Sequence, residues 1–264
     1  DFHPRSQGGR YDPALGWVTT DQATSPTLDT ADPSADYGSE PQPNGYRANQ
    51  GSYGQTDEAS KLYVPNYCPV TLTACQTGCL YQTIQAAVDA SSAASQSSPI
   101  SQHTCVVAMS TGPYNEAVLV QNILFANETS SFTIMADPAL SSHPVVTAPN
   151  ATAAFEIRNA SVNLVNFDIR PVPDNYQQIG YGVLASSAYV RISSVNVVSW
   201  HADHSNNDIT QSGIALSSWC TLSYSSITMR NSSNAGMAHG LSITGSNNTV
   251  SHSTAQIYGY DYAA

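Results

Sequence analysis

The segment "SWHADHSNND" contains the densest group of side chains in this sequence that could carry out chemistry. Its members are Trp200, His201, Asp203, His204 and Asp208. Two imidazoles and two carboxylates this close together could hold a divalent metal, and the Trp200 ring could stack on the face of a sugar. Because no complete ligand set arises from these residues alone, we favour a polar loop over a metal site. We retain the five residues as a candidate glycan-binding loop.

Motifs for enzyme chemistry are sparse in the rest of the sequence. Outside that segment we find no paired carboxylates, no nucleophile elbow and no phosphate-binding loop. We therefore predict no catalytic residue, no metal site and no cofactor.

The composition indicates a protein that works outside the cell. Only 10% of the 264 residues are charged, well below the roughly 25% that is usual for soluble domains, while 58 residues are Ser or Thr. The net charge of −11, without any cluster of Lys or Arg, argues against nucleic acid and anionic membrane surfaces as partners. No apolar run approaches the roughly 18 residues that span a bilayer. We expect an extracellular or cell-surface location without membrane insertion.

Four of the five Cys residues are candidates for disulfides. Cys68, Cys75 and Cys79 lie within "YCPVTLTACQTGC", and Cys105 follows. That segment has no His or CxxC partner at zinc-binding spacing, so disulfides fit better than a metal. The odd number leaves one thiol over. Cys220 lies at an apolar position of a repeat, where a buried thiol is ordinary.

Five N-x-S/T sequons are candidates for N-glycosylation: Asn127, Asn150, Asn159, Asn231 and Asn247. Nearly as many would arise by chance in a sequence this rich in Asn, Ser and Thr, so their number is not evidence of selection. Their positions at loops and corners would allow glycans.

From residue 154 onward the sequence is self-similar. The units start at Ala154, Gly182, Gly213 and Gly240, which are 28, 31 and 27 residues apart. Each unit has a small residue, an alternating apolar stretch, a polar corner and a second alternating stretch. Periods of this length with short strands indicate a solenoid, in which stacked turns share one core. We predict an all-β parallel β-helix over an antiparallel β-sandwich, because Gly and Asn pairs that would close tight hairpins are scarce.

Two other segments complete the predicted organisation. The segment "CLYQTIQAAVDASSAA" places Tyr81, Ile84, Ala87 and Val88 on one face at helical spacing, which predicts a short helix at about 80–94. Residues 1–61 are rich in Pro and Gly and lack a clear period, which predicts a loop-rich arm ahead of a β-helix at 62–264. The sequence starts at Asp1 without a signal-peptide pattern, so we expect either a removed leader or an internal portion of a longer protein.

The segments "TIQAAVDA" and "GPYNEAVLV" resemble the start of right-handed parallel β-helices of the pectin lyase-like superfamily. The resemblance implies that the helix caps the first turn, and that Glu116, in the G-x-Y-x-E motif, serves that turn structurally. It also implies an alternative function, a carbohydrate-active enzyme such as a polysaccharide hydrolase, lyase or esterase. Asp208 in "SNNDITQSG" and His239 in "MAHGLSI" resemble polygalacturonase segments only faintly, and the paired Asp and R-I-K motifs of that family are missing.

Within residues 1–61, the segment "SPTLDTADPSADYGSEPQPNGYRANQGSYGQTDEAS" resembles the element that closes many bacterial surface β-helix proteins at their C-terminal end. It departs from that pattern at Tyr46, Gln50 and Gln55. A closing element ahead of an opening one implies β-helix modules placed end to end, either in tandem along one chain or between copies of this chain, with the arm packing on a neighbouring β-helix.

The expected function is therefore that of an extracellular structural protein, a subunit or segment of a surface fibre, stalk or adhesin. One alternative is the enzyme described above. The other is a glycan-binding module that uses Trp200 or Tyr181 as an exposed aromatic platform.

Overall fold

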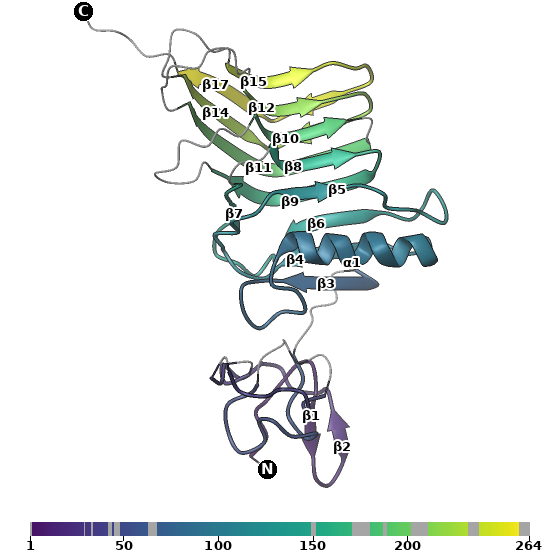
Figure 1. Cartoon of the computed structure of the whole chain (residues 1–264), viewed down its shortest axis with the longest axis vertical. Coiled ribbons are helices and arrows are strands. Elements are labelled where there is room, and N and C mark those ends of the chain that lie inside the picture. Colours follow the sequence, from purple (N-terminus) through teal and green to yellow (C-terminus); the bar gives the residue numbers. More distant parts are fainter. Residues whose placement is uncertain are drawn as a thin grey trace, which may run out of the picture.

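The computed structural model describes residues 2–28, 30–32, 34–41, 44, 48–62, 68–148, 152–170, 180–186, 189–201, 211–231 and 238–258, without the side chains of residues 199–201, 211, 230, 231 and 238. Within these residues the chain is mostly β, with parallel strands stacked as a β-solenoid and one α-helix (Figure 1). The predicted all-β parallel β-helix is confirmed. The antiparallel β-sandwich is wrong, because the strands described in the solenoid pair in parallel.

The solenoid has three faces, and one turn of the chain around them is called a rung below. The first face contains β5 (Val118–Val120), β8 (Ala153–Arg158), β10 (Tyr181–Ser186), β12 (Gln211–Leu216) and β15 (Ala238–Ile243). The second face contains β3 (Val70–Ala74), β4 (Thr104–Ala108), β6 (Phe132–Ala136), the starts of β9 (Ser161–Ile169) and β11 (Tyr189–His201), β13 (Thr221–Ser223) and β16 (Thr249–Ser251). The third face contains β7 (Val145–Val146), the ends of β9 and β11, β14 (Ser226–Asn231) and β17 (Thr254–Tyr258).

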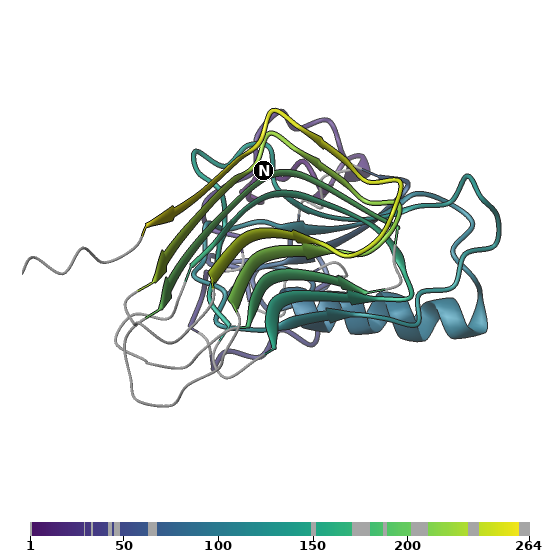
Figure 2. The same ribbon diagram turned by 90° about the horizontal axis from the view of Figure 1, so that it is seen from above.

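A column of left-handed residues forms the corner between the second and third faces. The bend lies at Asn166 in β9 and at Ser194 in β11, and strand register places Tyr224 and His252 at the same point of the next two rungs. Their φ angles are 63°, 55°, 49° and 49° in that order. Because this backbone conformation redirects an extended strand sharply, the solenoid acquires the angular cross-section that Figure 2 shows.

The predicted repeat units align with one another in the structure. Strand register places the four repeat starts opposite one another on the first face: Ala154, Gly182, Gly213 and Gly240. A Cβ atom built on Gly182 would lie 2.6 Å from Cγ1 of Val197, and one built on Gly240 would lie 2.9 Å from Cβ of Ala255. Val197 and Ala255 belong to the third face, so glycine lets the first and third faces approach closely.

The interior of the solenoid is a continuous apolar core. Its largest buried side chains include Phe132, Phe155 and Phe167, and the ring centroids of Phe155 and Phe167 lie 5.3 Å apart. Cys220 belongs to this core as a buried thiol outside both disulfides, as predicted. Because one rung cannot bury its apolar side chains alone, this core exists only through stacking.

The helix α1 (Ile84–Ser97) lies beside β5, at the free edge of the first face. Gln85 takes the place of a neighbouring strand there. Its Nε2 donates a hydrogen bond to the carbonyl oxygen of Leu119 at 3.2 Å, and its Oε1 accepts one from the Leu119 N–H at 2.6 Å. The helix therefore satisfies backbone groups of β5 that would otherwise be open to another strand.

The helix starts later than the predicted range of 80–94. Thr83 is the N-cap, because its side chain accepts a hydrogen bond from the Ala86 N–H. Ile84, Ala87 and Val88 are buried as expected. Tyr81, which we predicted on the same helical face, instead forms a parallel bridge with Ala74 before the helix begins.

The described part of the arm, within residues 2–62, is loop-rich as predicted and contains one hairpin, β1 (Arg10–Asp12) with β2 (Gly16–Val18). Glu40 organises its interior, since one carboxylate oxygen accepts hydrogen bonds from the N–H groups of Asn49 and Gln55, each at 2.8 Å. Gln55 has a φ of 66°, which is the conformation that favours the glycine of the pattern it resembles.

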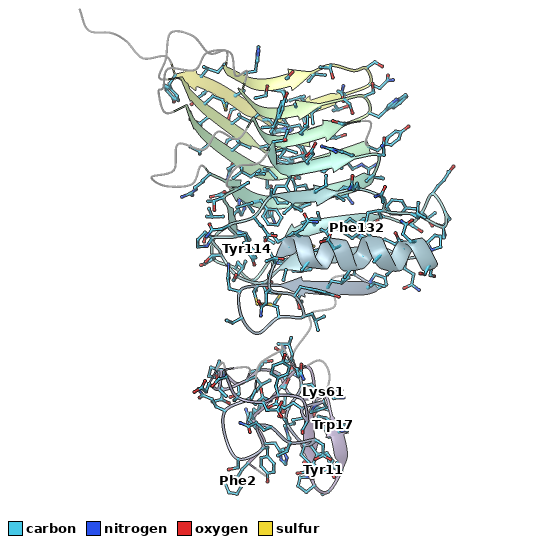
Figure 3. The ribbon with its side chains drawn as sticks, in the orientation of Figure 1. Phe2, Tyr11, Trp17, Lys61, Tyr114 and Phe132 are labelled. Carbon is cyan, nitrogen blue, oxygen red and sulfur yellow. A yellow bond between two sulfur atoms is a disulfide. The ribbon has the colours of Figure 1, made fainter. Side chains whose placement is uncertain are left out.

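The two ends of the arm meet. Ser60 Oγ donates a hydrogen bond to the Pro4 carbonyl at 2.6 Å, and the Lys61 ammonium lies 4.3 Å from the centroid of the Trp17 ring (Figure 3). The hydrogen bonds described for the arm thus join arm residues to one another. Figure 1 shows it as a unit apart from the solenoid, and residues 63–67 lie outside the described residues.

Disulfides join Cys68 to Cys105 and Cys75 to Cys79, so all four predicted cysteines are paired. The first links the chain before β3 to β4, and the second closes a short loop after β3. Within the described residues, no helix has the length and apolar character needed to cross a membrane.

Candidate functional site

The candidate glycan-binding loop falls mostly outside the described residues. Trp200 and His201 end β11 on the third face, in register with Arg230 and Asn231 of β14, and their side chains are not described. Asp203, His204 and Asp208 lie outside the described residues. The loop connects the third face to β12 of the first face, and its role stays a prediction.

A groove on the first face brings together two residues that the sequence singled out separately. Register aligns Tyr181 of β10, Ser212 of β12 and His239 of β15 on successive rungs. The groove has a volume of about 400 Å³. It is lined by Tyr181, Leu184, Ala185, Ser186, Ser212, Ala215, Leu216, Ser217, His239, Ser242 and Thr244.

The lining of this groove offers hydroxyl groups, an aromatic ring and an imidazole. Ser217 Oγ is buried and has no hydrogen-bond partner within the described part of the chain. None of the described lining residues carries a carboxylate. Inverting or retaining glycoside hydrolysis needs two carboxyl groups that face the same bond, and the described lining residues supply neither.

One carboxylate of the outer surface is held by an ion pair and hydrogen bonds within the solenoid. Asp168 on the third face accepts hydrogen bonds from Arg170 at 2.8 Å and from Asn196 Nδ2 at 2.9 Å, and His143 Nδ1 lies 3.3 Å away. Asn196 in turn accepts a hydrogen bond from Ser226 Oγ at 2.7 Å. This ladder runs from rung to rung, as expected of a group that fixes strand register.

Glu116 has a structural position at the start of α1. Its two carboxylate oxygens accept hydrogen bonds from the N–H groups of Ile84 at 2.9 Å and Gln85 at 2.8 Å. A carboxylate there satisfies N–H groups that the helix leaves open and faces the positive end of the helix dipole. Burial raises the pKa of Glu116, although both hydrogen bonds act to lower it.

A group of cysteine and histidine resembles a metal site in composition. Potential ligand atoms of Cys68, His103 and Cys105 lie within 4.8 Å of one another. Both sulfurs form the disulfide, and a thiolate is the form that binds metal. His103 Nε2 lies 2.8 Å from Thr133 Oγ1 of the neighbouring strand instead.

Two pairs of exposed rings lie at the edges of the second face, and neither pair was predicted from the sequence. Tyr189 and Trp219 lie on neighbouring rungs with ring centroids 6.4 Å apart, and Tyr224 stacks on His252 with centroids 4.9 Å apart. The sequence does contain a signal for the first pair. Tyr189 and Trp219 are about one repeat length apart, and each lies just before the second alternating stretch of its repeat unit.

Three of the five sequons have described side chains, and all three side chains are exposed. Asn127 Oδ1 accepts hydrogen bonds from the N–H groups of Thr129 and Ser130 in its own turn. Asn159 and Asn247 have left-handed φ angles of 48° and 60°. The side chain of Asn231 is not described, and Asn150 lies outside the described residues.

Both ends of the described part of the solenoid present apolar surface. The last described rung, called the last rung below, exposes aliphatic side chains on all three faces: Ile243, Val250 and Ile257. At the other end, Val70 of β3 is exposed beside a cavity of about 490 Å³ between α1 and β3. Ser91 and Ser95 of α1 are among the residues that line this cavity.

No protein-family model matches the chain, and neither a curated protein nor a solved structure matches it.

Proposed function

We propose that this chain is an extracellular structural protein, a subunit or segment of a surface fibre, stalk or adhesin that is built by end-to-end stacking of pectin lyase-like β-helices. The observation that supports the proposal is the exposure of interior positions in the last rung. Val250 of β16 pairs in register with Leu222 of β13. Leu222 is fully buried, whereas 44% of Val250 is exposed.

The same comparison holds on the first face. Ile243 of β15 pairs with Leu216 of β12, and Leu216 is buried whereas Ile243 is exposed. Fully burying one such side chain is worth about 1.5–3 kcal/mol. The last strands, β15, β16 and β17, also have an edge on which no described strand pairs. A further rung would cover these side chains and pair these edges, whether it came from the same chain or from another copy.

The opposite end supplies surfaces of a matching kind. β3 is the edge strand of the second face, and the cavity beside it is lined by both apolar and hydroxyl-bearing side chains. The arm stands ahead of this end in sequence and has its own ordered contacts, such as those of Glu40. These features suit an arm that closes a neighbouring β-helix.

Electron microscopy of the full chain tests this proposal. We expect filaments or rods longer than one solenoid, and we expect Val250→Lys to abolish them because it places a charge in the stacking surface. The matched control is Leu124→Lys, because Leu124 is exposed to a similar extent, 43%, away from the last rung. Single short rods at every concentration, or filaments that survive Val250→Lys, would overturn the proposal.

Glycan binding is a second candidate function, and the groove on the first face favours it. Tyr181 and His239 line one hydroxyl-rich groove whose described residues carry no carboxylate. An oligosaccharide array probed with the wild-type chain and with Tyr181→Ala tests it, and we expect any binding to be lost in the variant. Cleavage of an acidic polysaccharide by the same chain would favour the enzyme alternative instead.

A further inference from the structure

Tyr189 and Trp219 form an exposed aromatic pair on the outside of the second face. They belong to neighbouring rungs, because register pairs Arg191 with Thr221 two residues further along. The exposed fractions are 62% for Tyr189 and 57% for Trp219. The ring centroids lie 6.4 Å apart with an angle of 37° between the planes. Tyr189 begins β11, and Trp219 lies in the turn two residues before β13. Two large rings exposed side by side form a platform that a flat apolar surface can contact.

A cation stands next to this platform. Arg191 is exposed and lies two residues after Tyr189 on β11, with the buried Val190 between them. Side chains two apart on a strand point to the same side, about 6.6 Å from each other. Arg191 therefore projects from the same surface as the two rings.

Arg191 differs from the two neighbouring arginines whose side chains are described. Arg158 is paired with Glu156, and Arg170 is paired with Asp168. None of the ion pairs described within the solenoid includes Arg191. Its register neighbours are Asn163 on one side and Thr221 on the other, which are neutral hydrogen-bonding groups. In a chain with a net charge of −11, this position presents an exposed guanidinium to an anion from outside.

We infer that Tyr189, Arg191 and Trp219 bind a glycan residue that carries a carboxylate, such as a sialic acid or a uronic acid. The apolar face of the sugar ring stacks on Tyr189 and Trp219. The carboxylate forms a charge-assisted, bidentate pair with Arg191. Asn163 and Thr221 lie where they can exchange hydrogen bonds with sugar hydroxyls.

The chemistry of the patch selects this class of ligand. A single guanidinium between neutral side chains matches one carboxylate, whereas a nucleic acid would need several cations and would be repelled by the net negative charge. The platform lies on the outer side of the second face, and Trp219 belongs to the rung next to the last one. End-to-end assembly uses the interior positions of the last rung, and the groove lies on the first face, so the inference depends on neither of them.

Asn247 lies on the next rung from Trp219, because register pairs Thr221 with Thr249. A glycan attached to this sequon would reach the same platform and compete with a free ligand. The chain should therefore be produced in a host that does not glycosylate Asn. If a glycosylating host is used, the Asn247→Gln variant removes the competing glycan.

Calorimetric titration with sialyllactose, with oligogalacturonate and with lactose tests the inference. We expect the wild-type chain to bind at least one of the two acidic ligands more than about tenfold tighter than lactose. Arg191→Gln should remove that preference, and Trp219→Ala should remove binding. Tyr224→Ala is the matched control. Trp219 and Tyr224 are both exposed rings with left-handed φ angles, 65° and 49°, but they lie at opposite edges of the second face.

Each outcome decides the inference. Binding that Arg191→Gln and Trp219→Ala weaken, and that Tyr224→Ala and Tyr181→Ala leave unchanged, supports it. Equal affinity for lactose and both acidic ligands, absence of binding, or binding that only Tyr181→Ala weakens would overturn it. Circular dichroism and the melting temperature of each variant show that the folded solenoid is the species titrated.

Discussion

Met229 and Ile257 occupy the same interior position on successive rungs, yet 1% of Met229 and 53% of Ile257 is exposed. The difference arises because β17 covers Met229, whereas no described strand covers Ile257. The same side-chain position is therefore part of the core in one rung and part of the surface in the next. A lysine substituted at each position measures how much the covering rung contributes to the free energy of unfolding.

We expect Met229→Lys to prevent folding or to lower the free energy of unfolding by more than about 4 kcal/mol, because it buries a charge without a partner. Ile257→Lys should change the free energy of unfolding of the isolated chain by less than about 1 kcal/mol. Urea denaturation followed by circular dichroism measures both. A large loss of stability in Ile257→Lys at low protein concentration would contradict the view that this position is open in a single copy.

The aligned glycines of the first face, Gly182, Gly213 and Gly240, leave little room for a side chain, above all in the middle of the solenoid. A Cβ atom on Gly213 would clash with Cγ2 of Ile227 and would lie 2.7 Å from the carbonyl oxygen of Gly240. We expect Gly213→Ala to lower the free energy of unfolding by about 2–3 kcal/mol. Gly240→Ala in the last rung should cost less, and Ala255→Gly added to it should restore stability, because Cβ of Ala255 is the atom that it meets. Equal losses in the two single variants would contradict this account.

Much of the fold was predictable because each turn of a solenoid repeats the same short pattern of residues. The repeat starts at Gly182, Gly213 and Gly240 indicate which residues face each other on neighbouring rungs, and the strand register confirms them. The start of α1 was predicted less well. Tyr81 fits the helical spacing, but its backbone hydrogen-bonds with Thr73 and Cys75 as a strand would, and such a non-local pairing leaves no periodic signal in the sequence.

The candidate sites were less predictable than the fold. Trp200, His201 and Asp203 were predicted as a candidate glycan-binding loop because they lie within four consecutive residues. Tyr189 and Trp219 are 30 residues apart and become neighbours only when the rung is closed. Tyr181 and His239 were noted separately, and only the parallel register of β10, β12 and β15 places them in one groove.

The two disulfides should contribute unequally to stability. Cys68 and Cys105 are 37 residues apart, whereas Cys75 and Cys79 are 4 residues apart. In the chain-entropy account a disulfide restricts the unfolded chain more when it closes a longer loop, which gives about 4 kcal/mol for the first and about 2 kcal/mol for the second. We expect replacement of Cys68 and Cys105 by Ala to lower the urea midpoint more than replacement of Cys75 and Cys79. Cys220→Ala controls for the loss of a buried sulfur, and the opposite order would contradict the prediction.

Glu116 should make the stability of the chain depend on pH in an unusual direction for a carboxylate that caps a helix. Burial raises its pKa above the ordinary value of 4.5, so the folded state favours the protonated form. The stability from this group is fully present below pH 4.5 and is lost as the pH rises through the raised pKa. The free energy of unfolding of the wild type should therefore fall, relative to that of Glu116→Gln, as the pH rises from 4.5 through the raised pKa of Glu116.

Urea denaturation of the wild type and of Glu116→Gln at a series of pH values measures this difference. Because the remaining ionisable groups are shared, their contributions largely cancel in the comparison. Glu128→Gln is the matched control, since Glu128 is an exposed carboxylate in a loop. The difference in free energy of unfolding between this variant and the wild type should not show the same fall with rising pH. A wild-type advantage that grows with pH would mean that the hydrogen bonds from Ile84 and Gln85 outweigh burial and that the pKa of Glu116 is lowered.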